Sequence, residues 1–237
     1  MIEITNLCKS FDKKPVIKEV SLRVAEAETL CLLGPSGAGK TTLIRLVSGA
    51  IRADAGEIVI NGIKAPSMKL YAEMGFMPQG DALYNDLTGF DNLLFFGGLY
   101  GLKGKALRER ALELLATLGL ADDKDKLAYN YSGGMRKRLS LAIALLHKPR
   151  FLLLDEPTVG IDPILRQEIW QLFHRLEEGG ATLIVSTHVM DEAAKCRRTA
   201  LIYEGRIVAD DTTEHLLART NGNIEELFFM VQKGEIQ

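Results

Sequence analysis

The sequence predicts an α/β fold with a parallel sheet at its centre. Three apolar runs, at residues 29–33, 151–154 and 182–185, are continuous rather than alternating, which is typical of strands buried on both faces. A helical pattern of apolar residues fills positions 165–178, between the second and third runs. Because parallel strands need a crossover connection, this strand–helix–strand order indicates a parallel sheet.

Further strands are expected to be antiparallel. Apolar and polar residues alternate within positions 1–30, which favours short strands with one buried face. The strand-like residues 56–60 are followed by Asn-Gly, a pair that tolerates the positive φ angles of a tight hairpin turn. A second hairpin is predicted where residues 200–203 and 206–209 flank a Glu-Gly pair. We therefore expect an antiparallel β subdomain, N-terminal in the chain, beside the α/β core.

Between residues 86 and 148 the pattern becomes mostly helical. Apolar residues recur at helical spacing between Leu107 and Leu118, and Gly119 stands where this helix should end. Neither an internal repeat nor a linker rich in proline and serine divides the sequence. We therefore predict one domain over 1–237: an α/β core with its β subdomain in 1–85 and 149–220, an inserted helical subdomain in 86–148, and a tail in 221–237.

Composition excludes several classes of protein. Hydrophobic residues make up 47% of the chain and charged residues 25%, which argues against disorder. Lys and Arg total 29 against 31 Asp and Glu, so no basic field is expected to hold nucleic acid. Cys8, Cys31 and Cys196 are too few and too scattered for a disulfide framework, which favours a reducing compartment. The first residues do not resemble a secretory signal, and charged residues interrupt the longest apolar stretch, 139–154. We therefore expect a cytoplasmic protein that meets a membrane only through a partner.

A glycine-rich loop follows the first buried run and matches the phosphate-binding pattern G-x-x-x-x-G-K-[ST]. Its backbone N–H groups can surround phosphate oxygens at the start of a helix, where the helix dipole favours negative charge. The lysine is expected to neutralise the β- and γ-phosphates, and the threonine after it to place its hydroxyl on Mg²⁺. The predicted nucleoside triphosphate site comprises Gly34, Pro35, Ser36, Gly37, Ala38, Gly39, Lys40, Thr41 and Thr42.

Two carboxylates follow the second buried run, where ligands bind in open α/β sheets. Asp155 is placed to hold Mg²⁺, directly or through water, and Glu156 is the candidate base that polarises the attacking water. The alternative is that both residues only cap the following helix, with Pro157 in its first turn.

A third motif narrows the type of nucleotide-binding protein. Residues 131–136 read Tyr-Ser-Gly-Gly-Met-Arg and resemble the signature of the ATP-binding cassette (ABC) family, usually written Leu-Ser-Gly-Gly-Gln. Ser132, Gly133 and Gly134 match this signature, whereas Tyr131 replaces leucine and Met135 replaces glutamine. The resemblance extends from the first strands to about residue 215, because further family motifs follow in the right order.

The resemblance implies roles for four more residues. Gln79 is similar to the glutamine of the Q-loop and would serve both catalysis and the metal. Asp162 resembles the D-loop aspartate of the nucleotide site. His188 resembles the switch histidine, which bonds the γ-phosphate and water; a structural core histidine is the alternative. Phe11 resembles the aromatic that stacks on adenine, with plain hydrophobic packing as the alternative.

The resemblance also implies a dimer. Ser132, Gly133 and Gly134 should begin a helix, and in the family such exposed N–H groups contact the ATP bound by a partner copy. Two chains then enclose two ATP molecules, and either a homodimer or a heterodimer is compatible with the sequence. Met135 lacks the amide through which glutamine would make polar contacts across that dimer.

These motifs lead to the hypothesis of an ATP-binding and ATP-hydrolysing subunit of an ABC transporter, with ATP and Mg²⁺ as cofactors. Residues 135–140 are similar to exporter-type cassettes, and the short C-terminal segment favours the same subclass. The resemblance implies a separate integral membrane permease, docked near Gln79 and residues 86–100, that holds the chain at the cytoplasmic face of the membrane. No nucleic acid partner is expected. The alternative is a soluble ABC ATPase without a transport role, and a P-loop kinase would not explain the Ser-Gly-Gly motif.

Overall fold

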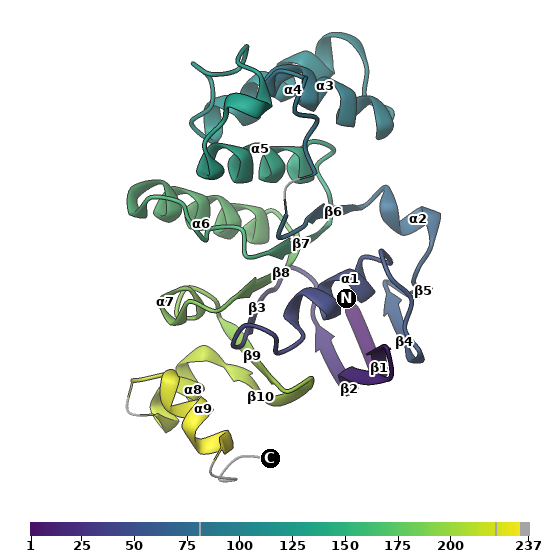
Figure 1. The fold of residues 1–237 in the computed structure, drawn as a ribbon, viewed down its shortest axis with the longest axis vertical. Coiled ribbons are helices and arrows are strands. Elements are labelled where there is room, and N and C mark those ends of the chain that lie inside the picture. Colours follow the sequence, from purple (N-terminus) through teal and green to yellow (C-terminus); the bar gives the residue numbers. More distant parts are fainter. Residues whose placement is uncertain (81, 221, 233–237) are drawn as a thin grey trace.

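A six-stranded sheet forms the centre of the computed structural model, which describes residues 1–80, 82–220 and 222–232 (Figure 1). Its strand order is β10-β9-β3-β8-β7-β6, with all neighbours parallel except the antiparallel pair β9 and β10. The three predicted buried strands lie side by side as β3-β8-β7, which confirms the parallel core. The strands are β3 (Thr29–Leu33), β6 (Met74–Met77), β7 (Phe151–Asp155), β8 (Thr182–Thr187), β9 (Arg198–Tyr203) and β10 (Arg206–Thr212).

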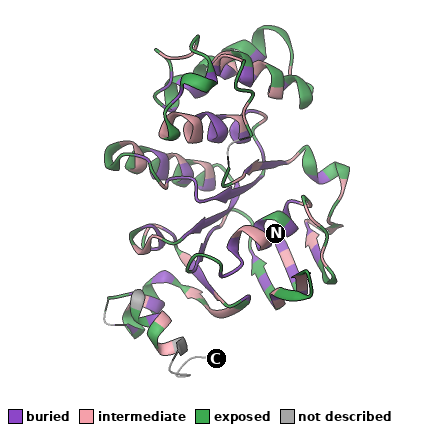
Figure 2. Cartoon of the chain, viewed as in Figure 1, coloured by how far each residue is buried: buried purple, intermediate pink, exposed green. Residues whose placement is uncertain are grey.

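Strand β3 shows why the apolar runs are continuous. Leu30 and Leu32 belong to the core shared with helix α1 (Lys40–Val47) and the N-terminal strands. Cys31 and Leu33 belong to the opposite core, which includes helix α6 (Pro163–Glu178). Since both faces are covered, every residue of the strand is buried, as the central strands of Figure 2 illustrate.

A separate four-stranded sheet confirms the predicted antiparallel strands. Its order is β2-β1-β4-β5, built from β1 (Ile2–Phe11), β2 (Lys14–Val24), β4 (Ala55–Ile60) and β5 (Ile63–Lys64). The predicted hairpin turn joins β4 to β5, and Asn61 and Gly62 adopt φ angles of 47° and 75°. The second predicted hairpin is β9–β10, but β9 also pairs with β3 and so belongs to the central sheet.

The helices of the inserted segment gather at one end of the molecule (Figure 1). They are α3 (Gly89–Leu99), α4 (Gly104–Thr117), the 3₁₀ turn η1 (Ala128–Asn130) and α5 (Gly133–Leu145). The other helices are α2 (Met68–Tyr71), α7 (Met190–Ala193), α8 (Thr213–Arg219) and α9 (Glu225–Gln232). The subdomain boundaries stay a prediction, and positions 221 and 233–237 of the predicted tail lie outside the described residues. Within the described part of the chain, no helix combines the length and apolar character needed to cross a membrane.

Candidate active site

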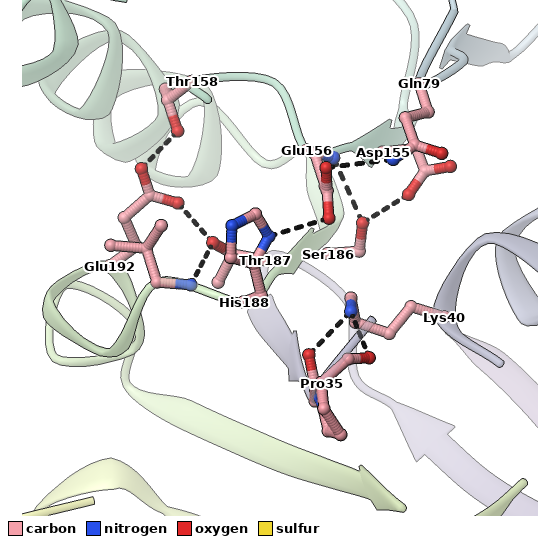
Figure 3. A network of polar contacts seen from close by, with 12 residues as sticks. Pro35, Lys40, Gln79, Asp155, Glu156, Thr158, Ser186, Thr187, His188 and Glu192 are labelled. Atoms are coloured by element: carbon pink, nitrogen blue, oxygen red, sulfur yellow. Dashed lines mark hydrogen bonds and ion pairs between the residues drawn. The ribbon is translucent and has the colours of Figure 1, made fainter. Parts of the chain in front are cut away.

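The candidate site lies where three central strands end. Leu33 of β3 pairs with Thr187 of β8, and Asp155 of β7 pairs with Ser186 of β8. Because these strands are parallel and in this register, the segments that follow them leave the sheet at one edge. Residues far apart in the sequence, the glycine loop, Glu156 and His188, therefore meet there (Figure 3).

The glycine loop curls between β3 and α1 with little room for larger side chains. A Cβ atom on Gly34 would lie 2.4 Å from the carbonyl oxygen of Ile202. Gly39 has a φ of 111°, in the left-handed region that favours glycine, and leads directly into α1 at Lys40. The loop bounds a cavity of about 260 Å³, lined by Val16, Ser36, Gly37, Gly39, Lys40, Thr41, Thr42, Gln79 and Glu156. Eight of these nine lining residues were predicted site residues.

Lys40 is the buried cation of this cavity. Its Nζ donates hydrogen bonds to the carbonyl oxygens of Gly34 at 2.6 Å and Pro35 at 2.9 Å, so the ammonium lies over the loop. Burial lowers the pKa of Lys40, while the nearby charges of Glu156 and Asp155 act in the opposite direction. The arrangement places a positive charge beside the N-terminus of α1, where phosphate oxygens would bind.

Glu156 is held from both sides at the edge of the cavity. His188 Nδ1 lies 2.9 Å from Oε1, and Gln79 donates from Nε2 to Oε2 at 3.1 Å. The Glu156 backbone is left-handed, with φ of 52°, and its N–H donates to both the carbonyl and the hydroxyl oxygen of Ser186. Such a backbone in a residue with a side chain is strained, and strain of this kind concentrates at functional sites.

The electrostatics of the site favour an ionised Glu156. Burial alone would raise the pKa of the Glu156 carboxyl, but hydrogen bonds from His188 and Gln79 lower it. The charges of His188 and Lys40 act in the same direction, and the pKa ends below its usual value. This carboxyl group is therefore ionised at neutral pH.

Asp155 has a different environment from its neighbour. It is 1% exposed, and its Oδ1 accepts a hydrogen bond from the Ser186 hydroxyl at 2.6 Å. Asp155 is not among the lining residues of the cavity, whereas Thr41 and Gln79 line it with a hydroxyl and an amide oxygen. Mg²⁺ binds hard oxygen ligands, commonly one or two carboxylates together with substrate phosphates, so this donor set fits the metal.

The signature residues begin helix α5, as the sequence predicted. Ser132 is the N-cap, and its side-chain oxygen accepts a hydrogen bond from the backbone N–H of Met135 at 3.3 Å. Gly133 and Gly134 form the first turn, and a Cβ atom on Gly134 would lie 3.4 Å from the carbonyl oxygen of Gly160. None of the three signature residues lines the cavity of their own chain.

Asp162 and Phe11 also lie outside the lining of this cavity. Asp162 caps helix α6, accepting a hydrogen bond from Leu165 N at 3.0 Å. The alternative reading of Asp155 and Glu156 as helix caps is therefore wrong, because α6 begins only at Pro163. Phe11 is 44% exposed at the end of β1, and Lys9 Nζ lies 5.4 Å from its ring centroid.

Three residues that contact the site were not predicted. Val16 lines the cavity from β2, a strand distant in sequence, and no local signal marks it. Lys137 donates from Nζ to the carbonyl oxygen of Glu156 at 3.0 Å, and burial lowers its pKa. Ser186 bonds both Asp155 and Glu156, and as a polar residue next to the end of a buried strand it carried a usable signal.

A glycine loop between strand β3 and helix α1, with an Asp-Glu pair at the end of strand β7 of the same sheet, defines a P-loop nucleoside triphosphatase. Residues 17–159 match the ABC transporter family, and the chain belongs to this family. It is 39% identical over 227 residues to the linearmycin resistance ATP-binding protein LnrL of Bacillus subtilis (strain 168), covering 94% of this chain and 73% of that protein.

Other relatives agree with this assignment. The chain is 37% identical over 222 residues to the probable multidrug ABC transporter ATP-binding protein YbhF of Escherichia coli (strain K12), covering 93% of this chain but 38% of YbhF. The ATP-binding cassette MJ0796, solved as a dimer in a post-hydrolysis state bound to ADP and Pi, superimposes with a TM-score of 0.83 at 28% identity, over 90% of this chain and 99% of that one.

These findings confirm the predicted fold class, a P-loop core with an antiparallel β subdomain and inserted helices. They also confirm an ATP-binding, ATP-hydrolysing subunit of the transporter class, of the drug-resistance and export type. The alternative of a soluble cassette without a transport role is not supported by these relatives.

Proposed function

We propose that the chain hydrolyses ATP in the cavity bounded by the glycine loop, with Glu156 as the general base. The observation that carries this proposal is the Glu156 carboxylate held at the cavity edge by His188 and Gln79. The lowered pKa of Glu156 keeps the carboxylate ionised, as a general base must be, and its two hydrogen bonds hold it at the cavity edge, where it can meet the attacking water. His188 bonds the γ-phosphate and orients that water, and Gln79 completes the catalytic set.

Nucleotide binding is assigned to the loop at residues 34–42. The backbone N–H groups of the loop surround the phosphates, and Lys40 supplies the positive charge against the β- and γ-phosphates. Phe11 stacks on adenine; its exposure supports this role over hydrophobic packing. The role of Lys40 rests on its place in the cavity lining and its charge, and that of Phe11 on its exposure.

Thr41, Asp155 and Gln79 are proposed to hold Mg²⁺ through oxygen atoms, Asp155 directly or through water. When bound, the metal would neutralise charge on the phosphates while the γ-phosphoryl group is transferred to water. Ser186 keeps the Asp155 carboxylate oriented by donating to Oδ1. Lys40, beside both Asp155 and Glu156, balances their negative charge.

Ser132, Gly133, Gly134 and Asp162 are proposed to complete the site of a partner copy. Ser132 and Gly133 are exposed and lie outside the cavity of their own chain, so their N–H groups at the start of α5 are free to face another phosphate. ATP would then join two chains, and hydrolysis would release them. Both a homodimer and a heterodimer satisfy this arrangement.

The work of this ATPase is proposed to be export through a separate integral membrane permease. Large exposed apolar side chains lie just beyond Gln79, at Tyr84, Phe95 and Leu99, in the region expected to meet the permease. Tyr84 and Phe95 pack edge to face, with ring centroids 4.6 Å apart. Docking there would hold the chain at the cytoplasmic face of the membrane.

The test uses a tagged Glu156→Gln chain, expressed in its native cell and extracted in mild detergent with ATP. Mass spectrometry then identifies the proteins that co-purify, with a tagged Lys40→Ala chain as the control for dependence on ATP. We expect a polytopic membrane protein at stoichiometric level. Recovery of soluble partners alone, with the chain absent from membranes, would overturn the transport proposal.

A further inference from the structure

A buried carboxylate outside the ATP cavity joins the two segments that carry Glu156 and His188. Glu192, in α7, is 1% exposed. Its Oε1 accepts a hydrogen bond from the Thr158 hydroxyl at 2.5 Å, and its Oε2 accepts one from the Thr187 hydroxyl at 2.6 Å. Figure 3 shows the carboxylate between these hydroxyls, to the left of His188. Both threonines are fully buried, so each hydroxyl depends on this partner.

The two threonines that bond Glu192 lie close in the chain to Glu156 and His188. Thr158 follows Glu156 by two residues, and Thr187 directly precedes His188. The Thr187 hydroxyl also accepts a hydrogen bond from the backbone N–H of Val189 at 3.0 Å. Thr187 and Val189 flank His188 in the chain, so this bond restrains the backbone on both sides of the histidine. Glu192 therefore spans the gap between two segments whose functional side chains meet at 2.9 Å.

Arg166 extends the same contact to the segment that leads to Asp162. Its Nη2 donates to the carbonyl oxygen of Ile161 at 3.0 Å, while its Nε lies 4.0 Å from Oε1 of Glu192. That Nε is buried and makes no hydrogen bond among the described residues, so the Glu192 charge is its close electrostatic partner. Thr158 and Arg166 thus connect both the first half and the end of the turn 156–162 to the Glu192 carboxylate.

Burying a carboxylate is unfavourable unless hydrogen bonds and charge compensate for the lost water. An apolar side chain would fill the space beneath α7 at lower cost, so the carboxylate is best explained by what it positions. Its hydrogen-bond donors come from the Glu156 segment and the His188 segment, and its charged partner comes from α6.

We propose that Glu192 is a positioning residue that sets His188 against Glu156 and couples the segment 158–162 to the switch histidine. This inference rests on the roles given to Glu156 and His188 under the proposed function. It implies that a displacement of the Asp162 segment, such as contact with a partner copy, would be transmitted through Thr158 and Glu192 to His188. Glu192 itself contacts neither nucleotide nor water in this scheme.

The test removes the Thr158 hydroxyl while keeping the shape of the side chain. Thr158→Val loses the bond to Glu192, Thr158→Ser retains it, and Thr199→Val is the matched control. Thr199 is also a buried threonine bonded through its hydroxyl, to Thr213 at 2.8 Å, but it lies outside the site. We expect kcat of Thr158→Val to fall on the order of 10- to 100-fold, as small misplacements of catalytic groups do, with ATP affinity within about twofold of wild type. Thr158→Ser and Thr199→Val should keep kcat near wild type.

A double-mutant cycle separates positioning from a general loss of stability. If Thr158 acts through His188, then Thr158→Val should cause no further loss of kcat in a His188→Ala chain. Additive losses, or a kcat of Thr158→Val no lower than that of Thr199→Val, would overturn the inference. Glu192→Gln, which keeps the shape but not the charge, serves the same cycle if Thr158→Val does not fold.

Failure of the proposed function and failure of this inference give different results. If Glu156→Gln and His188→Ala both hydrolyse ATP normally, the proposed function is wrong. If those two variants are impaired while Thr158→Val and Glu192→Gln are active, only this inference is wrong.

Discussion

His188 Nδ1 lies 2.9 Å from Oε1 of Glu156, although 32 positions separate the two residues along the chain. The contact follows from the pairing of β7 with β8, in which Asp155 is opposite Ser186, so that Glu156 and His188 both follow within two residues of this pair. Glu156 is further restrained by Gln79 and by the Lys137 ammonium on its carbonyl oxygen. The Glu156 carboxylate thus receives side chains from the segments after β8 and β6, and its backbone carbonyl receives one from helix α5.

Glu156→Gln should abolish most ATP turnover while retaining ATP binding. The amide keeps the shape and can still bond Gln79 or His188, but it cannot accept a proton from water, and general bases contribute on the order of 100- to 10,000-fold. We expect phosphate release to fall by at least about 100-fold and ATP-bound dimers to accumulate in size-exclusion chromatography. Glu178→Gln, an exposed change on α6, is the control. Unchanged steady-state hydrolysis in Glu156→Gln would remove the residue from the role of base.

Lys40→Ala should weaken nucleotide binding itself. The Lys40 ammonium is the positive charge among the residues that line the cavity, and its loss removes the charge that attracts the phosphates. We expect ATP affinity to fall at least about tenfold in equilibrium titration, since charge-assisted bonds contribute roughly 1.5–3 kcal/mol. Lys105→Ala, at an exposed residue of α4, should bind as wild type. An affinity equal to wild type would contradict the assignment of the phosphate loop.

Ser132→Arg should leave ATP binding to one chain intact and abolish ATP-dependent dimers. The long side chain would occupy the start of α5, where a partner phosphate is proposed to bind. The change also removes the N-cap bond to Met135, which costs about 1 kcal/mol of stability. Thr88→Ala removes the comparable cap of α3 and controls for that loss. Persisting dimers in the Ser132→Arg chain, measured by light scattering with ATP, would reject the partner-site role.

The low pKa of Glu156 predicts a pH-dependent contribution to stability. Ionisation of this carboxylate stabilises the folded chain above its ordinary pKa of 4.5, and the contribution is lost as the pH falls through the lower folded-state pKa. The stability advantage of wild type over Glu156→Gln should therefore be constant above about pH 6 and decline below the ordinary pKa. Urea unfolding without nucleotide over this range measures it, and an advantage that grows on acidification would show the opposite sign of shift.

Tyr131→Phe should reduce stability without affecting catalysis. The Tyr131 hydroxyl donates to the carbonyl oxygen of Asp123 at 2.8 Å, and burial raises the pKa of Tyr131 to about 12. Removing the hydroxyl leaves that carbonyl without this donor, which should lower the free energy of unfolding by about 1 kcal/mol. The kcat for ATP should equal that of wild type. A loss of turnover without a loss of stability would instead give the hydroxyl a functional role.

Much of this fold could be predicted because its signals are local in the sequence. The strands β3, β7 and β8 are buried on both faces, and each contains a continuous apolar run of at least three residues. The hairpin at Asn61 and Gly62 depends on φ angles that these residues tolerate. The glycine loop was predictable for the same reason. Gly34 and Gly39 occupy positions where a side chain would collide with neighbouring atoms or strain the backbone.

The remaining features depend on which segments the fold brings together. Val16, Lys137 and Ser186 reach the site only because a distant strand, helix α5 and the neighbouring strand β8 converge there. Contacts between such segments follow from strand register and helix packing, so no short stretch of sequence marks Val16 or Lys137. Ser186 is marked only as a polar residue within a buried strand.

Motif and burial pattern therefore established an α/β nucleoside triphosphatase with Lys40 and Glu156 as candidate site residues, since each motif is short and chemically specific. Tertiary structure alone decided that Glu156 is held by His188 and Gln79, and that its backbone is left-handed. It also decided that Glu192 lies between Thr158 and Thr187. The physical reason is that burial and hydrogen bonding at one edge of the sheet involve residues from many parts of the chain, and their relative positions are set only when the sheet and its covering helices have packed.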